Sequence, residues 1–204
     1  MEHHFPTKLN INVTDNYSLK CFFERPSEDV KAKIIQNSNS ELIEFGIALS
    51  TCAEYLTSNR NPHYYKDVVL NLLRNGVQVT FFLLNPKGEI IKWYAAERNE
   101  KLDTKINTSL EKLQSFVDQH QNEPGIENVQ IKLYDHLPYF ACVVVDRCCA
   151  LYSSYMPYYS NYFVKRADSP HYFIIQKEHP KIMNQINSSI DAILQDEKTT
   201  DYRG

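Results

Sequence analysis

Long apolar runs are missing from this chain of 204 residues. No stretch approaches the roughly 18 consecutive apolar residues of a membrane-spanning helix, and no charged-then-apolar leader opens the chain. These two absences predict a cytoplasmic protein with no membrane span.

Paired cysteine motifs are also missing. No CxxC pair occurs among the five cysteines, which are Cys21, Cys52, Cys142, Cys148 and Cys149. Metal sites built on cysteine need paired spacings with histidine nearby, and a disulfide framework favours an even count. We therefore expect reduced thiols, no metal and no cofactor.

A basic stripe is the third absence. Lysine and arginine (22) are scattered and slightly outnumbered by aspartate and glutamate (25), for a net charge of −3. Binding to a phosphate backbone needs clustered cations, so we expect no direct contact with nucleic acid. The 43% hydrophobic and 23% charged residues are typical of one soluble, folded domain.

Tyrosine is abundant where glycine is scarce: the chain has fourteen tyrosines and five glycines. Many of the tyrosines lie between residues 134 and 172. Such side chains suit a binding surface, because each offers apolar area and one hydroxyl, and they suit a half-buried sheet edge equally well.

Hydrophobic periodicity predicts alternating strands and helices. Expected strands cover residues 9–13, 18–23, 42–49, 77–84, 129–134, 140–146, 149–154 and 172–176. Expected helices cover residues 28–36, a segment from 61 to a left-handed cap at Asn75-Gly76, a long region 89–121, and residues 180–195.

A strand, a helix ending in Asn-Gly and a second strand are typical of a parallel βαβ unit. The sequence therefore predicts an α/β fold with a mixed, largely parallel central sheet flanked by helices. We expect an N-terminal strand pair or arm at residues 1–27, the α/β domain at 28–196 and a disordered tail at 197–204.

Residues 140–154, FACVVVDRCCALYSS, combine an apolar strand ending in aspartate with a second strand ending in two serines. Together with LIEFGIALST and VQVTFFLLNPKG earlier in the chain, this outline resembles one half of a phospholipase-D-like fold. In that family the first strand carries histidine, any residue, lysine, four residues and aspartate. Here the histidine position corresponds to Phe140 and the lysine position to Cys142, while Asp146 comes one residue early.

The resemblance implies a fold without its chemistry. The family's reaction needs an imidazole nucleophile and a cation on the phosphate, and neither phenylalanine nor a buried thiol replaces them. It therefore implies a catalytically inactive domain that senses a small phosphorylated ligand or a partner protein. Domains of this kind occur in bacterial regulatory and signalling proteins, and the likeness also implies a homodimer.

The candidate ligand site lies where open α/β sheets collect ligands, at the carboxyl ends of the strands. At Asn85-Pro-Lys87, the lysine and the following N–H groups could hold an anion. The full candidate set is Ser50, Thr51, Asn85, Lys87, Tyr134, His136, Phe140, Asp146, Tyr152, Ser154 and His171.

Two other functions remain open. A hydrolase could use His136 or His171 with Asp135 or Asp146, provided that these side chains converge. Alternatively, the tyrosine-rich residues 152–162 could form the interface of an interaction or dimerisation module.

Overall fold

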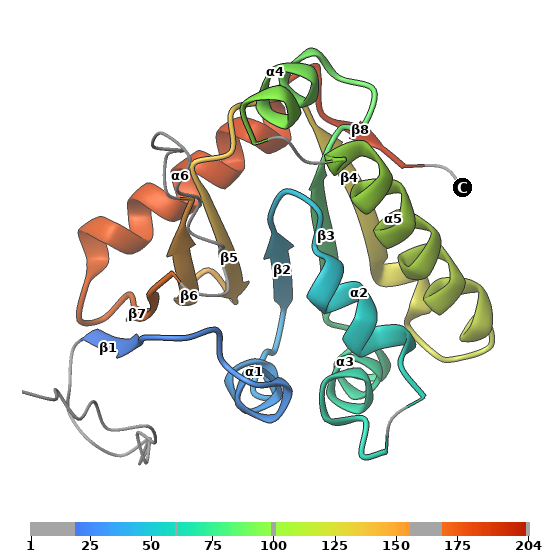
Figure 1. Cartoon of the computed structure of the whole chain (residues 1–204). Helices are drawn as coiled ribbons and strands as arrows, with labels where there is room; N and C mark the ends of the chain where they lie inside the picture. The colour runs from blue at the N-terminus through green and yellow to red at the C-terminus, as the bar shows by residue number, and fades with distance from the viewer. Residues whose placement is uncertain (1–18, 60, 99–100, 156–168, 203–204) are drawn as a thin grey trace, which may run out of the picture.

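The computed structural model describes residues 19–59, 61–98, 101–155 and 169–202. Within them, one eight-stranded sheet runs in the order β1-β7-β6-β5-β2-β3-β4-β8 (Figure 1). The strands are β1 Leu19–Phe22, β2 Glu41–Phe45, β3 Gln78–Leu84, β4 Val129–Tyr134, β5 Phe140–Val145, β6 Cys149–Ser154, β7 His171–Ile175 and β8 Thr200–Asp201.

The mixed α/β class is confirmed, with one correction. Parallel pairing joins β2 to β3 and β3 to β4, whereas the other neighbouring strands of the described chain pair antiparallel. The sheet is therefore not largely parallel. The cause is the β5-β6-β7 meander, whose short connection at Asp146 and Arg147 reverses the chain.

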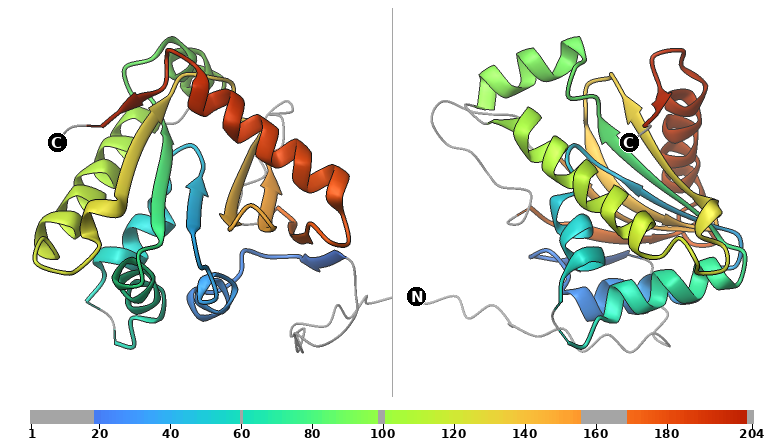
Figure 2. Two further views of the ribbon diagram at one scale, coloured as in Figure 1. Left: turned by 180° about the vertical axis from the view of Figure 1, so that it is seen from behind. Right: turned by 90° about the vertical axis from the view of Figure 1, so that its right-hand side faces the viewer.

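Helices cover both faces of the sheet. They are α1 Glu28–Ile35, α2 Ser50–Thr57, α3 Tyr64–Arg74, α4 Glu89–Arg98, α5 Leu102–Gln119 and α6 Pro180–Gln195. Seen from the edge of the sheet, α1, α2, α3 and α5 lie on one side and α6 on the other (Figure 2). Because both faces are covered, the central strands β2, β3 and β5 are almost continuously apolar.

The long helical region expected at 89–121 is two helices. The apolar positions with helical spacing, including Ile106, Leu110, Leu113 and Phe116, all lie in α5, where they are buried. In α4, by contrast, Ile91 is buried while Trp93 is 56% exposed. The periodicity therefore correctly predicted α5 but did not extend into α4.

Both ends of the described chain belong to the sheet. Strand β1 pairs with β7 at one edge, while the expected strand at residues 9–13 lies outside the described residues. At the other edge β8 pairs with β4, and the Tyr202 N–H donates to the Ile131 carbonyl at 2.8 Å. The expectation of a disordered tail is thus corrected for residues 197–202, since an open edge of β4 was available for pairing. Among the described residues, every helix is too short or too polar to cross a membrane.

Candidate functional site

A pocket of about 400 Å³ lies beyond the carboxyl end of β2, between the sheet and helices α1, α2 and α5. Its wall combines cations, hydroxyls and apolar side chains. The lining includes Arg25, Lys31, Glu44, Leu49, Ser50, Thr51, Leu102, Lys105, Ala141, Cys142, Val143, Leu151, Ser153, Tyr155 and His171.

A buried ion pair forms part of this wall. Lys31 Nζ lies 2.8 Å from Glu44 Oε1, and the two side chains are 7% and 4% exposed. The Tyr65 hydroxyl donates to the same oxygen. Burial, with smaller contributions from the Cys52 thiol and the Glu44 carboxylate, raises the pKa of Tyr65 well above its ordinary value, so the phenol remains a donor. Glu44 is therefore neutralised within the protein.

Two further cations reach the pocket from different elements. The Arg25 guanidinium, just before α1, donates from Nη1 to Thr51 Oγ1 in the first turn of α2. Lys105 lines the pocket from α5. The described wall therefore holds two cationic side chains besides the Lys31–Glu44 pair, in a chain whose net charge is −3.

Strands β6 and β7 contribute two buried polar groups, Ser153 and His171. Ser153 is 1% exposed, and its Oγ has no hydrogen-bond partner among the described residues. His171 is 3% exposed, and its Nδ1 lies 2.9 Å from the Ser169 carbonyl. A carbonyl only accepts, so Nδ1 carries the proton of this hydrogen bond.

The aromatic candidates pack in a cluster and do not belong to the described pocket lining. Register places Phe140 beside Ser154, and Cys142 beside Tyr152, so these four positions share one face of the sheet, and of the four Cys142 lines the pocket. There Phe140 packs against Phe45 and Tyr152, with ring centroids 5.2 and 5.4 Å apart.

Tyr134 belongs to the same aromatic cluster. Its ring stacks on Phe45 with centroids 4.8 Å apart, and its hydroxyl donates to the Gly46 carbonyl at 3.2 Å. The pocket lining includes none of the candidates Tyr134, Phe140, Tyr152 and Ser154. The part of β5 that lines the pocket consists of Ala141, Cys142 and Val143, none of which carries an imidazole or an ammonium group.

The predicted anion site at Asn85 and Lys87 is filled by the protein itself. The Asp135 carboxylate accepts from the backbone N–H groups of Glu89 and Ile90, each at 3.1 Å, at the start of α4. Asn85 Oδ1 accepts from the Lys87 N–H in the same turn. A Cβ on Gly88 would lie 2.2 Å from Asp135 Oδ1, so glycine is required for this close approach. Neither Asn85 nor Lys87 lines the pocket.

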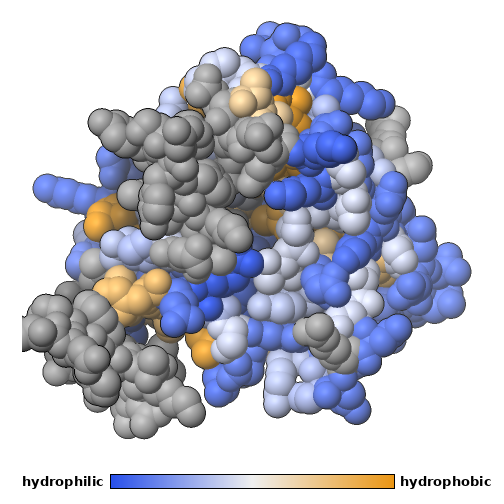
Figure 3. Space-filling model, viewed as in Figure 1, coloured by the Kyte–Doolittle hydropathy of each residue, from blue (hydrophilic) through white to orange (hydrophobic). Residues whose placement is uncertain are grey.

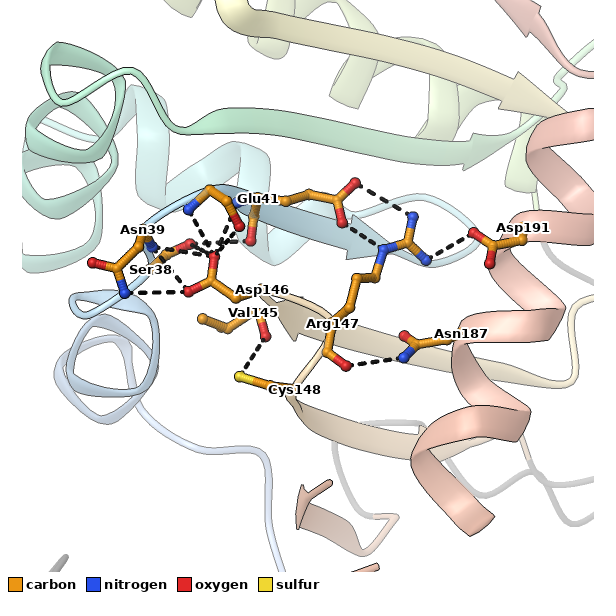
Figure 4. A network of polar contacts seen from close by, with 10 residues as sticks. Ser38, Asn39, Glu41, Val145, Asp146, Arg147, Cys148, Asn187 and Asp191 are labelled. Carbon is orange, nitrogen blue, oxygen red and sulfur yellow. Dashed lines mark hydrogen bonds and ion pairs between the residues drawn. The ribbon is translucent and has the colours of Figure 1, made fainter. Parts of the chain in front are cut away.

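His136 and Asp146 also lie away from the pocket lining. His136 Nε2 is 3.4 Å from Asp196 Oδ2, at the end of α6. Asp146 lies at the amino end of β2, opposite the pocket, where it accepts hydrogen bonds from the N–H groups of Asn39, Ser40 and Glu41 (Figure 4).

The hydrogen bonds to Asp146 dominate its ionisation. Partial burial alone would raise the pKa of this carboxyl, but the backbone N–H groups of residues 39–41 and the Ser40 hydroxyl hold it well below its ordinary value. Since Asp135 caps α4 and Asp146 is enclosed by residues 38–41, neither carboxylate joins His136 or His171 in a catalytic pair.

Of the sequence candidates, Ser50, Thr51 and His171 line the pocket. Sequence reasoning missed Arg25, Lys31, Glu44, Lys105 and Ser153. One signal was present: Glu44 interrupts an apolar strand, and a carboxylate at such a position needs a buried partner. Nothing in the local pattern identified that partner as Lys31.

No family model matches the sequence, and the search of curated proteins found no match. Solved structures are similar at low identity. Phosphatidylserine synthase from Haemophilus influenzae Rd KW20 matches with a TM-score of 0.53 and 12% identity, over 91% of this chain and 39% of that one. Nuc from Salmonella typhimurium, a phospholipase D family member, gives 0.47 and 11% over 92% and 99% of the two chains.

The archaeal chromatin protein TrmBL2 gives a TM-score of 0.48 at 8% identity, over 89% of this chain and 54% of that one. The chain thus spans about half of TrmBL2 and well under half of the synthase. At such identities the likeness concerns the fold alone. This chain shares its fold, a central mixed sheet flanked by helices, with the phosphatidylserine synthase.

Proposed function

We propose that this chain is a cytosolic regulatory domain that binds a small anionic ligand and does not cleave phosphodiesters. The observation that carries the proposal is the composition of the pocket. Arg25 and Lys105 supply positive charge, while the pocket-lining part of β5 has neither histidine nor lysine. Recognition of an anion needs positive charge, whereas the covalent chemistry of the phospholipase-D-like family needs the histidine and lysine that β5 lacks.

Catalysis by another route has little support. His171 is the histidine of the described lining, and Glu44, the acidic side chain of that lining, is already bound by Lys31 and Tyr65. One imidazole and a carboxylate that is already bound are a poor basis for phosphoryl transfer.

The test of inactivity is turnover of bis(p-nitrophenyl) phosphate by purified protein. We expect the rate to equal that of buffer and of the His171→Ala variant. Turnover by the wild type that disappears in His171→Ala would contradict the proposal.

The test of binding is a thermal-shift screen with nucleotides, phosphosugars and phospholipid headgroups. A ligand of the pocket raises the unfolding temperature of the wild type. It has no effect on Ala141→Leu, in which the added side chain occupies the pocket. Ala96→Leu, on the exposed side of α4, is the control that keeps the response. A screen in which no compound stabilises the wild type would count against a ligand-binding role.

A second function, an interaction or dimerisation module, is favoured by exposed aromatic side chains. Tyr139 is 70% exposed and Trp93 is 56% exposed, and such residues are enriched in protein interfaces. Among the coloured residues visible in Figure 3, however, the hydrophobic areas are small and separate. Of the segment 152–162, residues 156–162 lie outside the described part, and the Tyr155 hydroxyl accepts from the Ile47 N–H at 2.9 Å. Light scattering of the wild type, Tyr139→Ser and Trp93→Ser tests this function. If these side chains form an interface, the wild type is a dimer and the variants are monomers.

A further inference from the structure

We propose that the N-terminus of α2 is the point at which the pocket holds its anion, and that the ligand is a small phosphomonoester. This inference rests on the proposed function and names the ligand class and the groups that bind it.

The start of α2 is an open anion site. By helix geometry, the N–H groups of Ser50 and Thr51 have no partner inside the helix. The residue at the cap position is Leu49, whose side chain has no acceptor atom and whose φ is 49°. The first turn contains no acidic residue. Ser50, Thr51 and Leu49 all line the pocket, so these donors and the positive end of the helix lie at its wall.

The N-terminus of α4 has the same kind of N–H groups without a partner inside the helix, and there the protein itself supplies the anion. There Asp135 supplies a carboxylate to the N–H groups of Glu89 and Ile90. At α2 the local sequence supplies no such group, and a pocket of about 400 Å³ lies next to it. An anion from outside can therefore take the place that Asp135 occupies at α4.

A second observation points to a ligand at the same place. Ser153 Oγ is buried, lines this pocket and has no hydrogen-bond partner among the described residues. Buried hydroxyls are normally hydrogen-bonded. A ligand oxygen that reached the pocket wall would satisfy it. The group comes from β6, so it is independent of the helix.

Charge and size select a phosphomonoester. Arg25 donates to Thr51 Oγ1 and so holds its guanidinium beside the first turn of α2, and Lys105 faces the pocket from α5. Several converging donors and two cations favour a phosphate dianion, which accepts through three oxygens. The volume lies near the lower end of the range for ligand sites, about 300–1,000 Å³. Leu102 and Leu151 in the lining suit a small apolar body on the phosphate.

The experiment is isothermal titration of the full chain with inorganic phosphate, phenyl phosphate and its diester, methyl phenyl phosphate. Ser50→Asp adds a carboxylate at the exposed start of α2, and Ser50→Asn is its isosteric neutral control. We expect phenyl phosphate to bind the wild type about tenfold more tightly than the diester. Ser50→Asp weakens its binding about tenfold or more, and Ser50→Asn, which has the same shape but no charge, weakens it less than Ser50→Asp does. Ser153→Ala weakens it by roughly three- to tenfold.

Equal binding by Ser50→Asp and Ser50→Asn would overturn the inference, because the anion would then lie elsewhere. Inorganic phosphate that binds as tightly as phenyl phosphate would also overturn the inference, because the pocket would then hold an adventitious ion only. If phenyl phosphate fails to bind but another compound stabilises the wild type and not Ala141→Leu, the inference fails and the proposed function stands. If no compound does so, both fail.

Discussion

At the residue scale, the Asp146 carboxylate joins the start of β2 to the turn between β5 and β6. It accepts from Asn39, Ser40 and Glu41 N–H groups, while the neighbouring Arg147 pairs with Glu41 and with Asp191 of α6 (Figure 4). We expect Asp146→Asn to lower the free energy of unfolding at pH 7 by roughly 1–3 kcal/mol, because an amide does not match this set of donors. Urea denaturation measures the loss.

The same carboxylate predicts a dependence on pH. Its pKa is lower in the folded protein than the ordinary 3.8, so its contribution to stability is present above about pH 4 and is lost as the pH falls through the folded pKa. The wild type should therefore lose more stability than Asp146→Asn between about pH 5 and pH 2. Parallel losses in the two proteins would contradict this assignment.

The buried Lys31–Glu44 pair gives a second prediction at this scale. Lys31→Met leaves the Glu44 charge buried without its cation, and we expect a loss of about 3–5 kcal/mol in unfolding free energy. The control is Lys33→Met on the same helix. Lys33 Nζ lies 3.7 Å from Asp29 Oδ2, but the two side chains are 70% and 43% exposed, so a change within about 0.5 kcal/mol is expected. Chemical denaturation of both variants would show a clear difference; similar losses would contradict the burial of the pair.

At the scale of elements, two glycines in connecting segments have the same backbone conformation but different surroundings. Gly76, after α3, and Gly125, before β4, have φ of 81° and 82°. A Cβ on Gly125 would lie 1.9 Å from the Leu73 carbonyl oxygen, whereas a Cβ on Gly76 would have no described atom within 4 Å. We expect Gly76→Ala to cost about 1 kcal/mol, from the positive φ alone, and Gly125→Ala to cost several-fold more. Thermal unfolding of the two variants compares them directly, and equal costs would exclude the close packing of this turn on α3.

At the scale of the whole molecule, segments distant in sequence are interleaved in one sheet. Strand β1 pairs with β7, and β8 pairs with β4 at the other edge. No cut in the described chain separates two independent cores, so we expect a single cooperative unfolding transition. Far-UV and near-UV circular dichroism should give the same midpoint in urea. Two separated transitions would show that the β5-β6-β7 meander is an independent unit.

The similarity to solved structures belongs to this scale as well. A shared fold at 12% identity with a phosphatidylserine synthase does not transfer an activity. Function therefore depends on the pocket residues, and those of β5 include neither the histidine nor the lysine that the family resemblance would require there.

By itself, the sequence determined the α/β class, the order of most elements and the lack of histidine and lysine in residues 140–146. These features follow from the hydrophobic periodicity, the turn residues and the residue type at each position, which are local properties of the chain. It also placed Ser50 and Thr51 after β2, and His171 at the start of the last strand of the meander, where the structure brings them to one pocket.

The tertiary structure decided which distant side chains meet. Lys31 of α1 pairs with Glu44 of β2, Arg25 donates to Thr51 across 26 positions, and Asp135 caps α4 because β3 and β4 are adjacent. It also decided that Phe140 packs on Phe45 and Tyr152 instead of lining the pocket, and that residues 200–201 form a strand. Such contacts depend on strand register and crossover, which no local pattern specifies, because a shift of one residue moves every side chain of a strand to the opposite face.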